Sequence, residues 1–298
     1  IRSKTSKPLG AGPYIFDKYE NGVVSLKANP YYDQGEPKTK NLRMSYINQS
    51  DYINSILAGT ADVANPSYTN EIADAIKKAN SNGEVSGDKI YTVAVDALGY
   101  GYIGMNSHNI SVNKEPGSDA SKNLRRGFAT IFAAYRDLAV STYYGDRASV
   151  INYPISNTSW AAPQPTDDGY EIAFSKDVNG NPIYTSGMSD EDKYAAAKKA
   201  ALGFFEAAGY KVENGKIVSA PEGAKMEYTV MVPGGGTGDH PSFMIMTEAQ
   251  KALADIGMKL TINDLSNVSD MWNKIQAGQA EIWCAAWQST PDPDMYQV

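Results

Sequence analysis

The chain has 298 residues, 42% of them hydrophobic and 20% charged, which is an ordinary globular composition and enough length for two compact units. Its 27 basic and 34 acidic residues give a net charge of −7, which argues against nucleic-acid and anionic-membrane partners. A single cysteine, Cys284, excludes an internal disulfide and a cysteine-based zinc site. No apolar run approaches the ~20 residues needed to cross a bilayer.

The first third of the chain is expected to alternate short strands with short helices. Residues 14–16 and 23–26 flank Asn21-Gly22, a dipeptide typical of tight hairpin turns. Ser50 and Thr69 are candidate helix N-caps, because a hydroxyl can accept a hydrogen bond from the first turn of a helix. The other expected elements are a strand at 42–46, helices at 52–57 and 70–79, a strand at 61–64 and a β-rich run at 90–106.

The central part of the chain contains a break, a helix and a long loop. Residues 107–121 are rich in Asn, Ser, Pro and Gly, and we place a domain boundary there, after residue 106. One apolar stripe predicts a single helix at 123–143. Residues 151–187 show no helical period and many turn residues, which indicates a long ordered loop. Loops of that length inside a domain are usually functional or disordered.

Helices and strands alternate from Ser189 onward. Glu191 and Asp192 in a first turn favour a helix that starts at Ser189 and stops at Gly209. Strands are expected at 226–232, 258–263 and 281–287, with helices at 242–256 and 268–277 between them. This alternation predicts an α/β domain in which helices pack on a mixed sheet.

A glycine-rich loop at residues 233–238 lies between an expected strand and an expected helix, where phosphate groups often bind. Its glycine spacing does not fit the dinucleotide-binding pattern, no Walker lysine is present, and Asp239 would repel a phosphate. We therefore predict that residues 233–238 form a flexible connection between the strand and the helix, not a phosphate site. The two histidines, His108 and His240, have no cysteine partners and no metal-binding spacing, so neither a metal nor another cofactor is expected.

The strand expected at 281–287 carries the most informative candidate site. It ends on Trp287, and the residues that follow are Gln288, Ser289, Thr290 and Asp292. Ligands of open α/β sheets bind beyond the carboxyl ends of strands. An aromatic wall beside hydrogen-bonding groups fits a ligand site, and a core strand followed by a polar loop fits equally well.

Six short motifs follow one another in a recognisable order. They are GAGPY at 10–14 with LKANPYY at 26–32, ILAGTADV at 56–63, YIGMN at 102–106, LRRGF at 124–128, ALADIGMKL at 252–260, and AWQSTPDPD at 286–294. In this order the motifs resemble the signature of family 5 solute-binding proteins, the oligopeptide- and dipeptide-binding components of ABC importers. Each motif is weak alone, and their shared order across nearly the whole chain carries the resemblance.

The resemblance implies an α/β fold of the periplasmic-binding-protein type (type II, cluster C), with two lobes that are present here only in part. Residues 1–106 would form part of lobe one, a mixed sheet with short helices and a hinge strand at its end. Residues 107–298 would form most of lobe two, without its C-terminal tail. Family members are longer and begin with a lipoprotein or secretory signal, so we interpret the start at Ile1 as the interior of a longer protein.

The resemblance also implies a function without catalysis. The intact protein, expected to be monomeric, would close over a short peptide outside the cytoplasm and deliver it to the transmembrane subunits of an ABC permease. The expected ligand-binding residues are Tyr100, Tyr102 and Asn106 beside the hinge, and Ala286, Trp287, Gln288, Ser289, Thr290 and Asp292. Backbone groups of residues 286–288 would pair with the peptide as an added strand.

Two departures from the family pattern affect the expected site. Thr290 stands where the family carries an Asp that pairs with the peptide's α-amino group, and Arg136-Asp137 replaces the usual Asp-Arg pair. Two alternatives therefore stay open. One is a binder of the same family for nickel, heme or a sugar; the other is a secreted hydrolase that uses His108 or His240 with a carboxylate.

Overall fold

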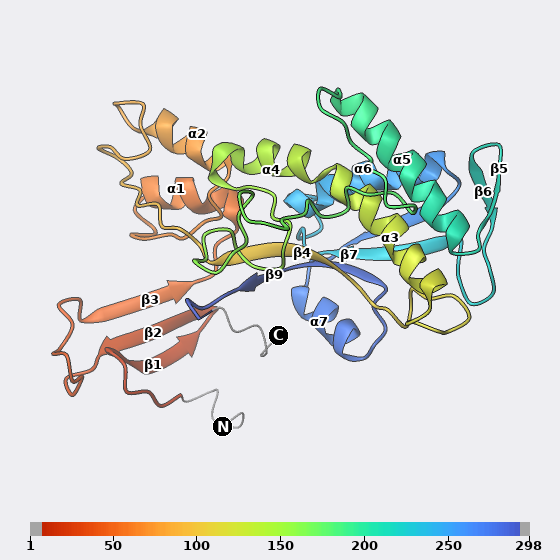
Figure 1. Cartoon of the computed structure of the whole chain (residues 1–298). Helices are drawn as coiled ribbons and strands as arrows, with labels where there is room; N and C mark the ends of the chain where they lie inside the picture. The colour runs from red at the N-terminus through yellow and green to blue at the C-terminus, as the bar shows by residue number, and fades with distance from the viewer. Residues whose placement is uncertain (1–7, 293–298) are drawn as a thin grey trace. The chain divides into compact units, whose positions relative to one another are not determined.

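A computed structural model describes residues 8–292 of the chain, with the elements drawn in Figure 1. The chain falls into two compact units, which divide between Thr92 and Val93. In the described part of the chain, no helix is long and apolar enough to cross a membrane.

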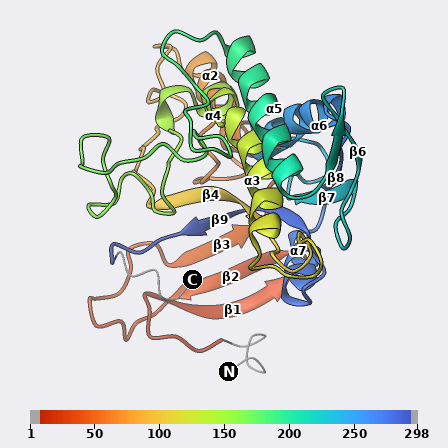
Figure 2. The ribbon, with the colours of Figure 1, turned by 45° about the vertical axis from the view of Figure 1, so that its right-hand side comes forward.

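The first unit contains a three-stranded antiparallel sheet of order β1-β2-β3 (Figure 2). Its strands are β1 (Tyr14–Glu20), β2 (Val23–Ala28) and β3 (Asn41–Ser45). Asn21 and Gly22 join β1 to β2 with φ angles of 50° and 77°. A type I′ turn requires this left-handed backbone at both central residues, and the hairpin predicted from the sequence is confirmed.

Short helices follow this sheet. They are η2 (Gln49–Asp51), α1 (Tyr52–Leu57) and α2 (Asn70–Ala79). Thr69 caps α2 as predicted, because its hydroxyl accepts a hydrogen bond from the Ile72 N–H at 3.2 Å. The prediction that Ser50 caps α1 is wrong: Asp51 occupies the N-cap position and makes no side-chain capping bond. The side chains of α1 and α2 instead share a small core around Ile72, Ile76 and Ile90.

The strand expected at 61–64 is absent from the structure, although these residues are all described. Val63 is 87% exposed, and no neighbouring strand pairs with its backbone. A valine raises β propensity, but a strand forms only where it can pair and pack. The β-rich run expected at 90–106 contains one strand, β4 (Gly99–Met105).

The second unit is built on a four-stranded mixed sheet of order β4-β9-β7-β8. The strands that join β4 are β7 (Glu227–Val232), β8 (Lys259–Asp264) and β9 (Ile282–Gln288). β7 runs parallel to both β8 and β9, whereas β4 is antiparallel to β9. The mixed sheet predicted from the alternating pattern is confirmed.

Helices cover both faces of this sheet (Figure 1). The helices of the unit are α3 (Asp119–Ala134), α4 (Arg136–Tyr144), η3 (Gly145–Arg147), α5 (Asp190–Ala207), α6 (Pro241–Asp255) and α7 (Val268–Gln276); a small hairpin, β5 (Lys211–Glu213) and β6 (Lys216–Ser219), follows α5. The large core lies between the sheet and helices α3, α5 and α6 and is centred on Phe128, Phe205 and Tyr228. On the opposite face, Met271 of α7 packs against Met231.

The single helix predicted at 123–143 is divided at Tyr135 into α3 and α4. Arg136 accounts for the break, because its Nε bonds the Ala133 carbonyl at 3.4 Å and its Nη1 bonds the Ile151 carbonyl at 3.0 Å. The guanidinium thus satisfies a carbonyl that a continuous helix would use and ties the start of the following loop to the helix end. The Tyr135 ring packs on Tyr194 of α5 at 4.6 Å.

Residues 151–187 form the long ordered loop that the sequence predicts, with one isolated bridge between Lys176 and Pro182. Side-chain hydrogen bonds, rather than the backbone hydrogen-bond ladder of a sheet, hold this loop. Asn152 donates to the Tyr170 hydroxyl at 2.8 Å and accepts from the Ala173 N–H at 3.1 Å. Hydrogen bonds between its own polar side chains and backbone therefore contribute to holding the loop.

The division between the units falls at Thr92/Val93, whereas the sequence places the domain boundary after residue 106. The difference arises because β4 pairs along its whole length with β9, from Gly99↔Gln288 to Met105↔Ile282. A strand expected at the end of the first segment is thus part of the second sheet. The assignment of the two units to lobes one and two stays a prediction.

Candidate functional site

The carboxyl ends of the three parallel strands meet at one edge of the second sheet, and β9 extends beyond the others. Among the described strands, β7 pairs with β9 only at Val230↔Ile282 and Met231↔Trp283. β4 follows β9 on its other side as far as Gln288. Residues 285–288 of β9 therefore have one edge paired with β4 and one edge that continues past the end of β7.

Burial decreases along β9 toward this end. Ile282 and Cys284 are fully buried in the core, and burial raises the pKa of the Cys284 thiol to about 12. Ala286, Trp287 and Gln288 are exposed, with 37% of Trp287 accessible. The strand thus leaves the core and presents its last three residues at the surface.

Aromatic rings form a row on one face of the β4–β9 pair, and we call Tyr100, Tyr102, Trp272 and Trp287 the aromatic row. Tyr100 lies opposite Trp287 in the antiparallel register, and alternate residues of a strand share a face. The rings of Tyr102 and Trp287 are stacked, with centroids 5.9 Å apart and planes 8° apart. Trp272 of α7 approaches Trp287 at 6.4 Å, so rings from three elements meet here.

Gly104 makes room for a third indole, that of Trp283, on the same face of the β4–β9 pair as this row. A Cβ at Gly104 would overlap the Trp283 ring, which lies directly opposite it in the register. The Trp283 Nε1 is buried without a hydrogen-bond partner among the described residues. The sequence analysis did not select Gly104 or Trp283. A glycine inside a predicted strand could have indicated them, since it often marks a point where another group packs closely against the backbone.

The polar residues after β9 are held by backbone contacts. The Ser289 N–H donates to the Leu98 carbonyl at 3.1 Å, and the Thr290 hydroxyl donates to the Asp292 carbonyl at 3.2 Å. The Gln288 amide lies against Gly99, where a Cβ would be 3.2 Å from its Oε1. Gln288, Ser289, Thr290 and Asp292 are therefore brought together at the carboxyl edge, while Asp294 of the same motif lies outside the described residues.

A turn of the long loop, residues 156–160, reaches the same place. Ser156 and Thr158 donate to the Ala97 carbonyl at 3.4 and 3.0 Å, and the Trp160 Nε1 donates to the Pro291 carbonyl at 3.3 Å. Sequence reasoning did not select Trp160. The sequence feature that could have indicated it is a tryptophan within a loop rich in Pro, Asn and Ser.

Asn106 lies at the opposite end of the β4–β9 pair from Gln288. Its N–H donates to the Glu281 carbonyl at 2.8 Å, and its Oδ1 accepts from the His108 N–H at 3.0 Å. Seven strand residues at ~3.4 Å each separate the two ends by roughly 24 Å. The structure therefore does not bring Asn106 to Trp287, and Asn106 organises a turn instead.

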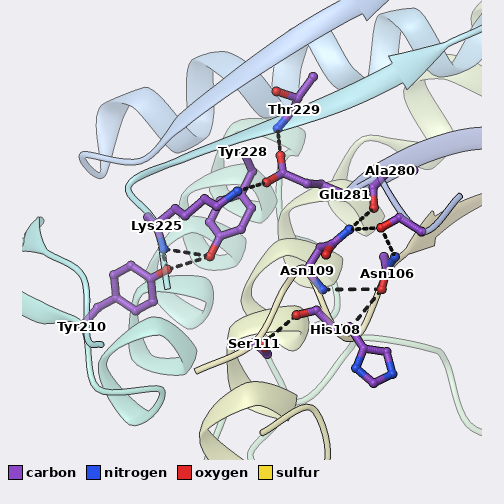
Figure 3. Close-up of polar contacts among 11 residues, drawn as sticks. Asn106, His108, Asn109, Ser111, Tyr210, Lys225, Tyr228, Thr229, Ala280 and Glu281 are labelled. Atoms are coloured by element: carbon purple, nitrogen blue, oxygen red, sulfur yellow. Dashed lines mark hydrogen bonds and ion pairs between the residues drawn. The ribbon is translucent and has the colours of Figure 1, made fainter. Parts of the chain in front are cut away.

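Glu281 braces that opposite end (Figure 3). Its carboxylate accepts from the Thr229 N–H at 2.7 Å and pairs with the Lys225 ammonium at 2.5 Å. The hydrogen bond to Glu281 raises the pKa of Lys225. Beside them the hydroxyls of Tyr210 and Tyr228 lie 3.2 Å apart, and burial raises the pKa of both phenols. This arrangement supports the sheet rather than a ligand.

His240 has a structural role at the glycine-rich loop. It is the N-cap of α6, and its Nδ1 accepts from the Ser242 N–H at 3.1 Å. Burial lowers the pKa of His240, and the charges of Asp239 and Asp264 only partly oppose this shift. A neutral imidazole whose Nδ1 is already bonded is poorly placed to act as a general base.

The glycine-rich loop itself is closed by a carboxylate. The Gly238 N–H, which a phosphate cradle would offer to its ligand, donates instead to Asp264 Oδ2 at 2.8 Å. Within the described ranges, no group of three or more His, Cys, Asp or Glu side chains is placed to hold a metal ion.

Comparisons with known proteins place this geometry in a wider context. The family described as "Bacterial extracellular solute-binding proteins, family 5 Middle" matches residues 2–298. No curated protein matches the chain.

The solved structures that share the fold include the following three. AppA from Bacillus subtilis in complex with a nonapeptide has a TM-score of 0.68 at 21% identity, covering 99% of this chain and 50% of that one. NikZ from Campylobacter jejuni in complex with Ni(L-His) has 0.65 at 19%, covering 98% and 48%. A dipeptide-binding protein from Pseudoalteromonas sp. SM9913 in complex with Met-Leu has 0.64 at 21%, covering 97% and 46%. The chain thus spans about half the length of these proteins.

Proposed function

Because the chain belongs to family 5 of the bacterial extracellular solute-binding proteins, we propose that it acts in the substrate-binding component of an ABC importer and captures a short peptide. The intact protein closes two lobes over the ligand outside the cytoplasm and presents it to the permease subunits in the membrane. Family and fold both point to binding without a chemical step.

The observation that carries this proposal is the open edge of β9 beyond the end of β7. An extended peptide adds to such an edge through main-chain hydrogen bonds, which do not depend on the peptide's sequence. Ala286, Trp287 and Gln288 offer these backbone groups at an exposed position. A strand edge that continues past the end of its neighbouring strand is a site where one more strand fits.

The side chains around this edge supply the remaining contacts. Trp287 and the tyrosines of the aromatic row form an apolar wall in which the Tyr102 and Trp287 rings are already stacked, so that little conformational entropy is lost on binding. Gln288, Ser289, Thr290 and Asp292 supply polar groups at the end of the strand. The solved relatives with a nonapeptide and with Met-Leu support a peptide as the ligand.

Calorimetry with a library of peptides of two to nine residues tests the proposal on the full-length protein. We expect specific peptides to bind, and the present chain alone to bind the same peptides more weakly, since it spans only about half the length of the relatives in complex with peptides. Equal, tight binding by the present chain would contradict closure by two lobes. Absence of binding to the full-length protein would contradict the peptide assignment.

Mass spectrometry of the material that co-purifies with the full-length protein separates the peptide from other ligands of the family. The relative in complex with Ni(L-His) makes a metal–amino-acid complex the alternative to look for. A hydrolase would lose activity on peptide substrates when His108 and His240 are both replaced by Asn, whereas peptide binding at β9 would persist.

A further inference from the structure

Trp160 stands out among the side chains near the carboxyl end of β9. Its ring is 80% exposed, although its only polar atom donates to the Pro291 carbonyl at 3.3 Å. Scattered apolar side chains on a surface need no special explanation. Trp160 differs from them because its contact joins the loop directly to the segment that follows Trp287.

The turn that carries Trp160 is held on both sides of the ring. Ser156 is 3% exposed and Ala162 is 7% exposed. Successive turn bonds connect them, from the Ser159 N–H to the Ser156 carbonyl at 2.9 Å and from the Ala162 N–H to the Ser159 carbonyl at 3.1 Å. The exposed indole therefore projects from a fixed backbone.

A second set of contacts fixes this turn to the β4 side of the site. The Thr158 hydroxyl donates to the Ala97 carbonyl at 3.0 Å, and the next carbonyl, that of Leu98, accepts from the Ser289 N–H at 3.1 Å. Three separate segments thus converge just beyond β9. Trp160 is the large apolar side chain that they present to solvent.

We propose that Trp160 forms an additional ligand subsite, which takes an aromatic side chain of the bound peptide. The inference rests on the proposed function and deepens it. Because the indole N–H is already bonded to Pro291, the ring offers its π-face, and aromatic partners stack on such a face. Rigid aromatic anchors also lose little entropy on binding, which suits them to recognition.

The subsite adds selectivity to a site that otherwise reads the peptide backbone. A ligand strand on the open edge of β9 would need to continue past Gln288 to approach Trp160, because Pro291, the partner of the Trp160 Nε1, lies three residues beyond the end of β9. Its side chain at that point meets Trp160, whereas side chains beside the strand meet Trp287. Trp160 and Trp287 therefore select at different positions of the same peptide.

Calorimetry on the full-length protein tests this subsite with penta-alanine and the five peptides that carry one Phe in place of one Ala. We expect one Phe position to be preferred through Trp160. W160A should lower the affinity for that peptide about 3- to 10-fold, the effect of one aromatic stacking contact, and leave penta-alanine unchanged. W160F keeps a ring and should retain most of the preference.

I172A is the matched control, because Ile172 is a 61% exposed apolar residue of the same loop. It should keep the wild-type preference. If W160A and I172A behave alike while the wild type binds, the Trp160 subsite is contradicted and the peptide assignment stands. If the wild type binds none of the peptides, both are contradicted. Penta-alanine with one Ala replaced by Arg is measured in the same way. A W160A effect confined to that peptide would contradict the aromatic assignment.

Thermal unfolding without ligand separates recognition from packing. An 80% exposed ring contributes little burial, so W160A and I172A should unfold at similar temperatures. A much lower unfolding temperature for W160A, with peptide preference unchanged, would show that Trp160 packs against the protein and would overturn the proposal.

Discussion

The indole ring of Trp287 lies almost parallel to the phenol ring of Tyr102, with centroids 5.9 Å apart and planes 8° apart. In the register Trp287 opposes Tyr100, and Tyr102 opposes Ala285, so the stacked pair is a diagonal one. The small side chain of Ala285 leaves room for this diagonal approach. Trp287 is consequently oriented before any ligand arrives, although 37% of it is exposed.

Replacing Trp287 by Ala should lower peptide affinity about 10-fold or more, because a preorganised aromatic anchor is lost at the open edge of β9. Calorimetry on the full-length protein measures the change. V218A is the control, since Val218 is a similarly exposed apolar side chain on β6, 47% accessible. Unchanged peptide affinity in W287A would contradict the assignment of Trp287 to the binding site.

Replacing Gly104 by Ala should destabilise the protein by ~1–3 kcal/mol, because the new Cβ overlaps the buried Trp283 ring and forces it to move. Gly101 of the same strand provides the control: its nearest neighbour to a new Cβ is the Ala285 carbonyl oxygen at 3.9 Å. G101A should change the free energy of unfolding by less than about 1 kcal/mol. Urea denaturation compares the two, and equal losses would argue against the close Gly104–Trp283 contact.

His240 should make stability depend on pH on the acid side of neutrality. The imidazole titrates near pH 6.5 in the unfolded chain, and burial lowers its pKa in the folded protein. The unfolded chain thus binds more protons as the pH falls below about 6.5, and the free energy of unfolding decreases until the folded pKa is passed. Protonation of Nδ1 also removes the acceptor that caps α6.

Asn at position 240 keeps a capping oxygen but does not titrate. Urea denaturation of H240N between about pH 7 and pH 5 should therefore show a shallower loss of stability than the wild type. H108N is the matched control, because it makes the same His-to-Asn change at an exposed position. Equal slopes for H240N and the wild type would contradict the buried, neutral His240.

Glu281 should matter more for its bond to the backbone than for its ion pair. E281A leaves the Thr229 N–H without its 2.7 Å acceptor and should cost ~1–3 kcal/mol of unfolding free energy. E281Q keeps an acceptor and loses the charge of the pair with an exposed Lys225, which should cost less than about 1 kcal/mol. Urea denaturation measures the free energy of unfolding of both variants. A larger loss in E281Q than in E281A would show that the ion pair matters more than the bond to the backbone.

Local patterns predicted the elements that local chemistry decides. Asn21-Gly22 specified a hairpin turn, Thr69 specified a helix start, and the alternation after Ser189 specified a mixed sheet. The division of the helix at Tyr135 was not predictable from periodicity. It depends on Arg136 reaching the Ile151 carbonyl, which is a contact between distant segments.

The same distinction applies to the candidate site. Trp287 and the polar residues after it could be selected because they lie at the end of a buried strand, and Tyr100 and Tyr102 because of the family resemblance. Trp160 could not, since only the folded loop places it beside Pro291. Asn106 was selected with the tyrosines, but the antiparallel register carries it to the far end of the strand.

The early end of β7 has a consequence for how a ligand would be read. A peptide that takes the place of β7 beside residues 285–288 must alternate its side chains, so that every second one turns toward the aromatic row and the others turn away. Successive side chains of the peptide would then lie on opposite faces of the sheet, in different environments. The spacing of two, rather than any particular amino acid, would be the first rule of recognition, and a shift of one residue would exchange the two sets completely.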